Sequence, residues 1–201
     1  MSTLFDVPPN NQTLPYDGEI EYIHNFLSIE ESTHYFEEVL TTTHWSLDTL
    51  TIAEKQIVSN RKTAWYGKEP FNYTYSGQLH IALPWNETIE KLHQKIEQTT
   101  NQSFNSCLLN LYENGSQGMG WHSDNEPELN PYSPIASLSL GTERHFDFKH
   151  KTTAEKIRLS LGNGSLLVMH PPTQKFWLHQ IPKSSTIHTQ RINLTFRNCI
   201  I

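Results

Sequence analysis

The first half of the chain contains two stretches in which apolar residues recur every three or four positions, the spacing of a helix with one buried face. Ser28 and Glu31 match a capping box, which satisfies free N–H groups where a helix begins. The apolar face of that helix is expected to be Ile29, Phe36 and Leu40. Asn86 is a good N-cap for the second helix, whose expected buried positions are Ile89, Leu92 and Ile96.

Short segments of strand-like sequence, bounded by turn signals, occupy most of the remaining chain. Before the second helix they are Trp45–Val58, which we interpret as two strands with a turn near Ala53 and Glu54, then Thr63–Tyr66 and Tyr73–Leu79. After the second helix they are Cys107–Tyr112, Ile135–Leu140, His145–Lys149, Ile157–Leu161, Ser165–Met169, Phe176–Ile181 and Ile192–Phe196.

This order of elements is typical of a mainly β protein with flanking helices, of the α+β class. We expect two sheets packed face to face, with both helices of the N-terminal half on one sheet. The length suits a single domain, residues 1–201. Residues 1–25, rich in turn-forming residues, are predicted to be an irregular lead-in.

Composition limits the class of protein. The chain has two cysteines, Cys107 and Cys199, which excludes a disulfide framework or a thiolate zinc site and fits a reducing compartment. We therefore expect a cytoplasmic protein, or a nuclear one in a eukaryote. No apolar run approaches the length of a membrane span, and the first ten residues do not resemble a secretory signal. We expect a monomer with no membrane partner.

The charge is unevenly distributed along the chain. The formal net charge is −6, which taken alone argues against a nucleic-acid partner. However, residues 1–50 hold nine acids and no Lys or Arg, so the remaining residues hold 15 bases against 12 acids. A basic face on the body of the protein is therefore compatible with the sequence, although a merely solvated acidic segment explains the asymmetry equally simply.

The sequence offers a possible metal site at His122 and Asp124. Residues two apart on extended backbone point the same way, so both side chains can bind one ion. One more histidine would complete the facial triad of non-heme Fe(II) oxygenases. The candidates are His170, His179 and His188, and His179 is favoured because it lies in a strand-like run. On its own, a His-x-Asp pair also occurs by chance among ordinary surface residues.

Residues 191–197 alternate strictly between polar and apolar side chains. Ile192, Leu194 and Phe196 share one face of the predicted strand, and the opposite face is formed by Arg191, Asn193, Thr195 and Arg197. A half-exposed strand with a solvated polar face is the simpler interpretation. Arginines that point into a sandwich would instead require an anion, and a guanidinium matches a carboxylate bidentately. Asn110 and Tyr112 could add hydrogen bonds to a dicarboxylate held beside the metal.

Several segments together resemble one known family. In chain order they are Arg61–Gly67, Tyr73–Gly77, Asn110–Tyr112, His122–Glu126, Ser133–Ser137, Gly164–Met169, His179 and Arg191–Arg197. The sequence is similar, over roughly Phe26 to Arg197, to the AlkB-type Fe(II)- and 2-oxoglutarate-dependent dioxygenases, nearest to their DNA-repair members. The resemblance implies a double-stranded β-helix (jelly-roll) core at residues 86–201, preceded at 26–85 by a helix and substrate-binding strands.

The resemblance also implies residue roles. His122, Asp124 and His179 would hold Fe(II) and carry the catalysis. The co-substrate 2-oxoglutarate would be bound by Asn110, Tyr112, Arg191, Asn193, Thr195 and Arg197, with O2 as the second co-substrate. Arg197 would also lie near the substrate base. The family reaction oxidises 2-oxoglutarate to succinate and CO2, hydroxylates an N-methyl group of a base, and releases that group as formaldehyde.

The implied substrate is methylated DNA, single- or double-stranded, carrying 1-methyladenine or 3-methylcytosine. Such a base must leave the duplex to be reached. It would lie between Tyr75 and His122, with Tyr73, Ser76 and Glu126 in contact with it, although Tyr73 and Tyr75 could equally pack within a sheet. Ile52 is a candidate apolar wedge. A cluster of bases could contact phosphates: Arg144, Lys149, His150, Lys151, Lys156 and Arg158.

Two alternatives stay open on the sequence. The same core motifs would serve an enzyme acting on RNA, tRNA or a non-nucleic substrate, because they contact the co-substrate and not the base. A non-catalytic jelly-roll binding module would also keep the shape, but the complete triad together with Arg191 argues against it.

Overall fold

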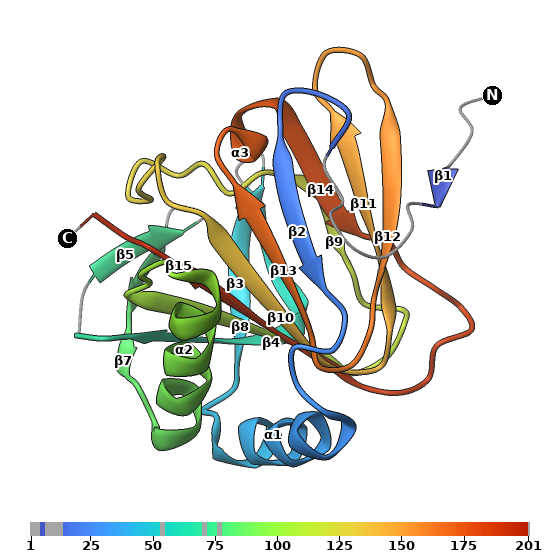
Figure 1. The fold of residues 1–201 in the computed structure, drawn as a ribbon. Coiled ribbons are helices and arrows are strands. Elements are labelled where there is room, and N and C mark those ends of the chain that lie inside the picture. The colour runs from blue at the N-terminus through green and yellow to red at the C-terminus, as the bar shows by residue number, and fades with distance from the viewer. Residues whose placement is uncertain (1–4, 7–13, 53–54, 70–71, 76–77, 201) are drawn as a thin grey trace.

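Two β-sheets lie face to face in the computed structural model, which describes residues 5–6, 14–52, 55–69, 72–75 and 78–200 (Figure 1). The larger sheet runs in the order β2 (Glu19–Ile23), β13 (Ser165–His170), β10 (Ile135–Gly141), β15 (Arg191–Arg197), β8 (Ser106–Tyr112), β4 (Lys55–Gly67) and β3 (Ser46–Ile52), with β7 (Leu83–Pro84) beside β4. The smaller sheet runs in the order β1 (Phe5–Asp6), β12 (Lys156–Leu161), β11 (Arg144–His150), β14 (Trp177–Ile181) and β9 (Met119–His122). This is the expected two-sheet jelly-roll architecture.

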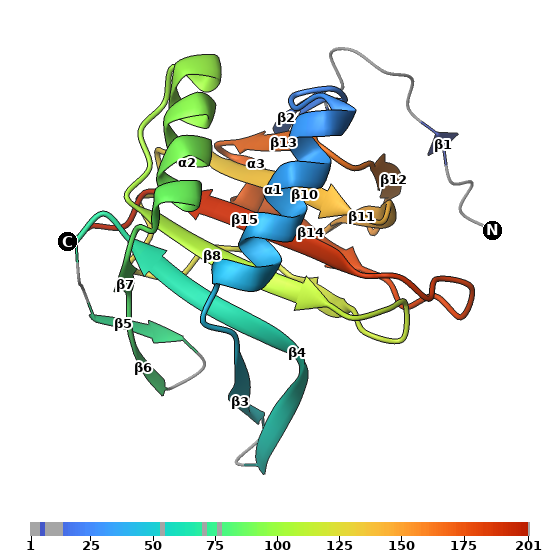
Figure 2. The same ribbon diagram turned by 90° about the horizontal axis from the view of Figure 1, so that it is seen from below.

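Helices α1 (Ile29–Thr42) and α2 (Glu87–Thr100) cover the outer face of the larger sheet, as expected (Figure 2). Both predicted caps form: the Glu31 N–H donates to Ser28 Oγ at 3.1 Å, and the Ile89 N–H donates to Asn86 Oδ1 at 2.8 Å. Ile89 and its partners on α2 are fully buried against the sheet. Ile29 was wrongly expected to pack, since it is 84% exposed and the buried side of α1 runs through Ser32 and Val39 instead.

The segment expected to be an irregular lead-in contains two strands. β2 pairs along its whole length with β13, and β1 pairs in parallel with β12. In β2, Ile20 and Tyr22 are buried while Glu19 and Glu21 are exposed, an alternation that a half-buried strand requires. The prediction of an irregular lead-in was therefore wrong at these two strands. The many turn-forming residues of this segment obscured the alternation of β2, which is only five residues long.

Three further differences concern strand boundaries. Residues 55–67 form one long strand, β4, rather than two segments, and the predicted run Tyr73–Leu79 is split between β5 (Asn72–Tyr75) and β6 (Gln78–Ile81), which pair with each other. The short strand β9 was not predicted at all. In Figure 2 the outer end of the β3–β4 hairpin projects from the larger sheet on the same side as the β5–β6 hairpin.

The space between the two sheets differs from the outer, helix-covered side. It is apolar toward β2, β11, β12 and β13, where Phe148, Leu161 and Leu167 pack. The space between the sheets becomes polar toward β8, β9, β14 and β15, and the predicted metal and co-substrate residues lie there. Within the described part of the chain, no helix has the length and apolar character needed to cross a membrane.

Candidate metal and 2-oxoglutarate site

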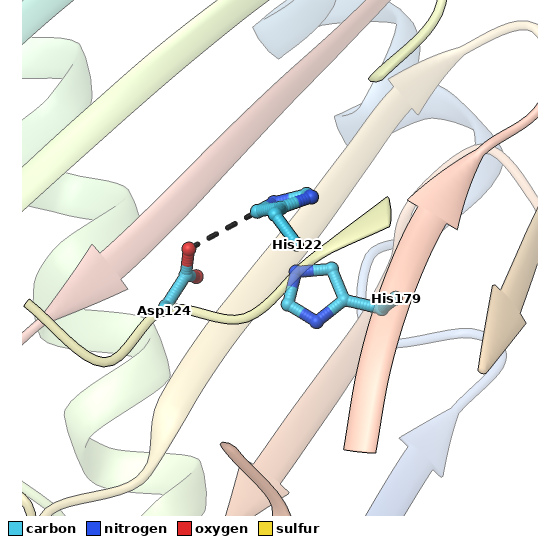
Figure 3. A group of neighbouring side chains, drawn as sticks. All are labelled: His122, Asp124 and His179. Carbon is cyan, nitrogen blue, oxygen red and sulfur yellow. Dashed lines mark ion pairs between the residues drawn. The ribbon is translucent and has the colours of Figure 1, made fainter. Parts of the chain in front are cut away.

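The structure brings His122, Asp124 and His179 together between the sheets (Figure 3). His122 is the last residue of β9, and its register partner on the neighbouring strand β14 is His179. Asp124 follows two residues later, in the loop after β9. One ligand atom from each residue lies within 4.8 Å of the others, the separation expected of groups that share one ion. In the described residues, neither His170 nor His188 belongs to such a group.

A bulge in β9 directs His122 inward. The pairing with β14 passes from His122–His179 to Met119–Ile181, so three steps along β9 match two steps along β14. Met119 and His122 consequently both line the interior. His122 Nδ1 lies 2.8 Å from the carbonyl oxygen of Gly120, an acceptor, so Nδ1 carries the proton and donates. Nε2 is therefore left with its lone pair for a metal.

Asp124 is buried and ionised. Burial alone would raise the pKa of its carboxyl group, but Arg197, His179 and His122 outweigh burial and hold that pKa well below its usual range. Arg197 Nη2 lies 2.9 Å from Asp124 Oδ2, and His122 Nε2 lies 3.8 Å from Oδ1. A metal ligand must be deprotonated, so these surroundings prepare Asp124 to bind a cation.

His179 is neutral for a different reason. Its ring is 4% exposed and stacks on Phe146 at a centroid distance of 5.2 Å. Burial lowers the pKa of His179 to about 3, with His122 adding to the effect. Its Nδ1 is buried without a hydrogen-bond partner among the described residues. The neutral imidazole is the form that binds Fe(II) or another divalent metal.

The polar face of β15 is completely buried, which rules out the simpler interpretation of a solvated face. Arg191 is 1% exposed, Asn193 8%, Thr195 7% and Arg197 4%. Arg191 Nη2 donates to Ser139 Oγ at 2.9 Å and to Asn193 Oδ1 at 3.0 Å. Its Nε and Nη1, however, have no hydrogen-bond partner in the described structure. Burial lowers the pKa of Arg191 to about 10, so at neutral pH a charged guanidinium presents two free donors.

The predicted partners of Arg191 lie beside it on β8. Tyr112 is its register partner, and the guanidinium carbon lies 5.6 Å from the Tyr112 ring centroid. Asn110 faces Asn193 across the same strand pair, and its Oδ1 accepts a 2.8 Å hydrogen bond from Arg61 Nε. The sequence analysis named Arg61 only as part of the family segment Arg61–Gly67 and did not predict that it contacts Asn110 in the site. Its burial at 5% exposure could not be inferred from local pattern.

These residues fit the two groups that the resemblance implies. A cavity of about 50 Å³ runs between the triad and the polar face, lined by Asn110, Tyr112, Asn193, Thr195, Arg197 and the three triad residues. Two imidazoles and one carboxylate suit iron and leave coordination positions open. The unpartnered donors of Arg191, at the strand end away from the metal, suit a carboxylate.

A larger cavity of about 680 Å³ adjoins the first, and Asp124 and Arg197 line both. Glu126 lies in its wall and is half-buried. Burial, together with Asp124, raises the pKa of Glu126. Its Oε2 is an acceptor with no hydrogen-bond partner within the described chain. The wall of the cavity thus contains a carboxylate with one unsatisfied, buried oxygen, two residues after the candidate metal ligand Asp124.

The side chains of the other predicted substrate contacts lie outside what the structure describes. Tyr73 and Tyr75 belong to β5 and Ile52 ends β3, but their side chains are not among those described. Ser76 lies wholly outside the described residues.

The expected phosphate-binding cluster is divided by the fold. Arg144 is buried, where its Nη2 donates to the carbonyl oxygens of Gln117 and Pro182, so the expectation that it meets phosphates was wrong. His150 is 4% exposed, and Arg158 is paired with Asp147. Lys149 and Lys156 do share an outer surface, over the Trp121 ring at 4.7 and 5.9 Å. Long side chains that reach internal carbonyls cannot be distinguished from surface bases by sequence alone.

Comparisons with known proteins agree with this geometry. The sequence model of the 2OG-Fe(II) oxygenase superfamily matches residues 19–197. The DNA oxidative demethylase ALKBH2 of Mus musculus is 36% identical over 91% of this chain and 77% of its own length. The alpha-ketoglutarate-dependent dioxygenase alkB homolog 3 of Bos taurus is 37% identical over 86% of this chain and 63% of its own length.

A solved structure, that of OsALKBH1, shares the fold with a TM-score of 0.65 at 16% identity, covering 93% of this chain and all of that one. The family match and the two sequence relatives carry the assignment further. The chain is an enzyme of the 2OG-Fe(II) oxygenase superfamily and belongs to its AlkB-type dioxygenases.

Proposed function

We propose that the protein is an oxidative demethylase of N-alkylated bases in DNA, acting on 1-methyladenine and 3-methylcytosine. The observation that carries the proposal is the unsatisfied Oε2 of Glu126 in the wall of the 680 Å³ cavity, beside the metal ligand Asp124. Both bases become cations when methylated on the Watson–Crick edge, and a buried carboxylate oxygen would pair with such a cation or its amino group. The cavity is also within the usual range of small-ligand pockets.

The comparisons support DNA as the substrate, because the Mus musculus relative carries the name DNA oxidative demethylase. The surface around Lys149, Lys156 and Trp121 supports it independently. A half-buried aromatic ring flanked by two ammonium groups suits a nucleic-acid strand, whose phosphates and bases it could meet together.

The residues of the site would divide the work as follows. His122, Asp124 and His179 hold Fe(II), which with 2-oxoglutarate and O2 supplies the oxidising chemistry that hydroxylates the N-methyl group. Arg191 anchors the distal carboxylate of 2-oxoglutarate, with Asn110, Tyr112 and Thr195 around it. Glu126 orients the base. Stacking of the base between Tyr75 and the His122 ring, with Tyr73 at its polar edge, stays a prediction from the family resemblance.

The proposal can be tested with matched oligonucleotides that carry one 1-methyladenine or 3-methylcytosine, as single-stranded DNA, duplex DNA and RNA. Each is incubated with the protein, Fe(II), 2-oxoglutarate and ascorbate, and mass spectrometry detects loss of one methyl group. We expect demethylation of at least one DNA substrate and none by His122→Ala. Removal of the methyl group from RNA alone, or from no substrate despite active succinate release, would overturn the proposal.

Glu126→Gln is the matched variant for the substrate contact, since it keeps the shape but removes the negative charge. We expect it to lower demethylation about tenfold or more while substrate-free 2-oxoglutarate turnover stays near wild type, because a charge-assisted hydrogen bond contributes about 1.5–3 kcal/mol. Equal effects on both reactions would assign Glu126 to the metal site instead.

A further inference from the structure

Asp124 lies in a loop, so contacts from other segments must hold it in place, whereas strand pairing holds the two histidine ligands. His122 and His179 are held by the ladder between β9 and β14, whereas Asp124 lies beyond the end of β9. Its carboxylate is held by Arg197 at 2.9 Å. Its backbone is held by a different residue, Gln174, whose Oε1 accepts a 2.9 Å hydrogen bond from the Asp124 N–H.

Gln174 is itself fixed on a short helical turn, α3 (Thr173–Phe176). Because the Asp124 N–H is a donor, the oxygen of the Gln174 amide must face it, and the Nε2 group then donates to Met169 Sδ at 3.3 Å. The preceding residue, Thr173, is fully buried, and its hydroxyl exchanges two 2.9 Å hydrogen bonds with the backbone of Glu19 in β2. The side chain that supports Asp124 is therefore anchored to the larger sheet.

Lys151 joins the same two segments from the β11–β12 turn. Its Nζ donates to Ser123 Oγ at 3.1 Å and to the carbonyl oxygen of Gln174 at 2.9 Å. Ser123 lies between the ligands His122 and Asp124. Three segments that are distant in sequence thus meet at the loop that carries the aspartate, and Gln174 is the residue that contacts the ligand directly.

We propose that Gln174 is a positioning residue for the metal site, which fixes Asp124 through its backbone amide, with Lys151 holding Gln174 and the Ser123 loop together. The inference rests on the metal site of the proposed function but not on the identity of the substrate. Partners of metal ligands orient the ligand atoms, and their loss commonly weakens metal binding 10–100-fold. Gln174 and Asp124 both line the 680 Å³ cavity.

The test measures metal binding rather than turnover. Metal-free protein is titrated with Co(II), and its visible absorption gives both the Kd and the ligand-field spectrum at saturation. Gln174→Met keeps the length of the side chain but has no oxygen acceptor, so we expect a Kd about tenfold or more above wild type and an altered spectrum. Gln174→Glu keeps an acceptor for the Asp124 N–H, so we expect it to bind Co(II) at least as tightly as wild type.

Lys175→Gln is the control, because Lys175 is the exposed neighbour on α3 and its ammonium lies over the Phe176 ring at 5.2 Å. We expect wild-type Co(II) affinity from it. Thermal unfolding of each metal-free variant verifies folding. If Gln174→Met does not fold, Lys151→Met replaces it, with weaker Co(II) binding again expected.

The outcomes separate the inference from the site itself. Wild-type protein that binds no Co(II), or binds it equally after His122→Ala, would disprove the metal site and this inference with it. Wild-type binding that depends on His122 but is unchanged in Kd and spectrum by Gln174→Met, or by Lys151→Met in its place, would disprove only the role of Gln174.

Discussion

The two faces of strand β15 are equally buried but are satisfied in different ways. On the helix side, Ile192, Leu194 and Phe196 are all fully buried among apolar neighbours, so their packing is complete within the protein. On the inner side, Arg191 is nearly as buried yet keeps two donors without partners in the described chain. Folding alone completes the contacts of the apolar face, whereas we propose that a bound 2-oxoglutarate completes those of the polar face. The comparison teaches that a buried, incompletely paired cation marks a binding site more clearly than burial alone.

The largest effect is expected from the apolar face. Leu194→Ala removes a fully buried side chain between the helices and the larger sheet, so it should lower the free energy of unfolding by about 2–5 kcal/mol. Denaturant unfolding measures the loss, and the KM for 2-oxoglutarate should stay near wild type at a temperature where the variant is folded. A large change in KM without loss of stability would erase the distinction between the faces.

On the polar face, Arg191→Met should have the opposite profile. Losing two charge-assisted hydrogen bonds to a carboxylate, together about 3 kcal/mol, should raise the KM for 2-oxoglutarate about 100-fold. The ligand-free variant should be as stable as wild type or more so, because the unpaired buried charge is removed. Arg191→Lys, which keeps the charge without the fork, should fall between the two. An unchanged KM for Arg191→Met would contradict the proposed role of Arg191.

Adding 2-oxoglutarate tests the polar face of β15 while leaving its apolar face unchanged. With Mn(II) in place of iron, 2-oxoglutarate at 100 times its Kd should stabilise wild-type protein by about 2.7 kcal/mol, seen as a rise in Tm. Leu194→Ala should show the same ligand-induced increase in Tm as wild type, although its ligand-free Tm is lower. Arg191→Met should lose most of that increase. If Arg191→Met keeps the full rise, the co-substrate is bound elsewhere.

A cation that is paired within the protein provides the smallest expected effect. Arg158 Nε and Nη2 lie 2.6 and 2.9 Å from the two carboxylate oxygens of Asp147, and Gln180 donates to the same group. Burial acts to raise the pKa of Asp147, but these partners outweigh it and lower the pKa below the usual value. The ionised pair therefore stabilises the fold above the pKa of an unfolded Asp, near 3.9, and this contribution is lost as the pH falls through the folded value.

Asp147→Asn should accordingly cost about 1 kcal/mol of unfolding free energy at neutral pH. Its stability should approach that of wild type as the pH falls below about 4, and its KM for 2-oxoglutarate should not change. Unfolding measured across pH checks this. A difference that is constant with pH would mean that the carboxylate charge of Asp147 contributes nothing.

Local pattern was sufficient for the features that depend on near neighbours. The helix caps at Ser28 and Asn86 and the two faces of β15 follow directly from residue spacing, and the structure has them. The choice of His179 over His170 and His188 followed from its place in a strand, and the register of β9 with β14 brings it to His122. The proposed 2-oxoglutarate contacts of β15 could be assigned only through the family resemblance, because the alternation of residues 191–197 is explained equally simply by a solvated strand face.

What could not be predicted depends on contacts between distant segments. Gln174 meets Asp124 across 50 positions of sequence, and Arg61 meets Asn110 across 49. Neither residue has a local signal that distinguishes it from a surface polar group. Arg144 was wrongly placed at the surface for the same reason, since its partners are carbonyl oxygens of two remote loops.

We propose that His122, Asp124 and His179 hold the iron that drives oxidation of 2-oxoglutarate. The most direct measurement is succinate release by purified protein supplied with Fe(II), 2-oxoglutarate, O2 and ascorbate. We expect succinate from wild type, and none above the protein-free background from His122→Ala or Asp124→Ala, both confirmed as folded by thermal unfolding. Equal succinate release by wild type and His122→Ala would show that these three residues do not hold a catalytic iron.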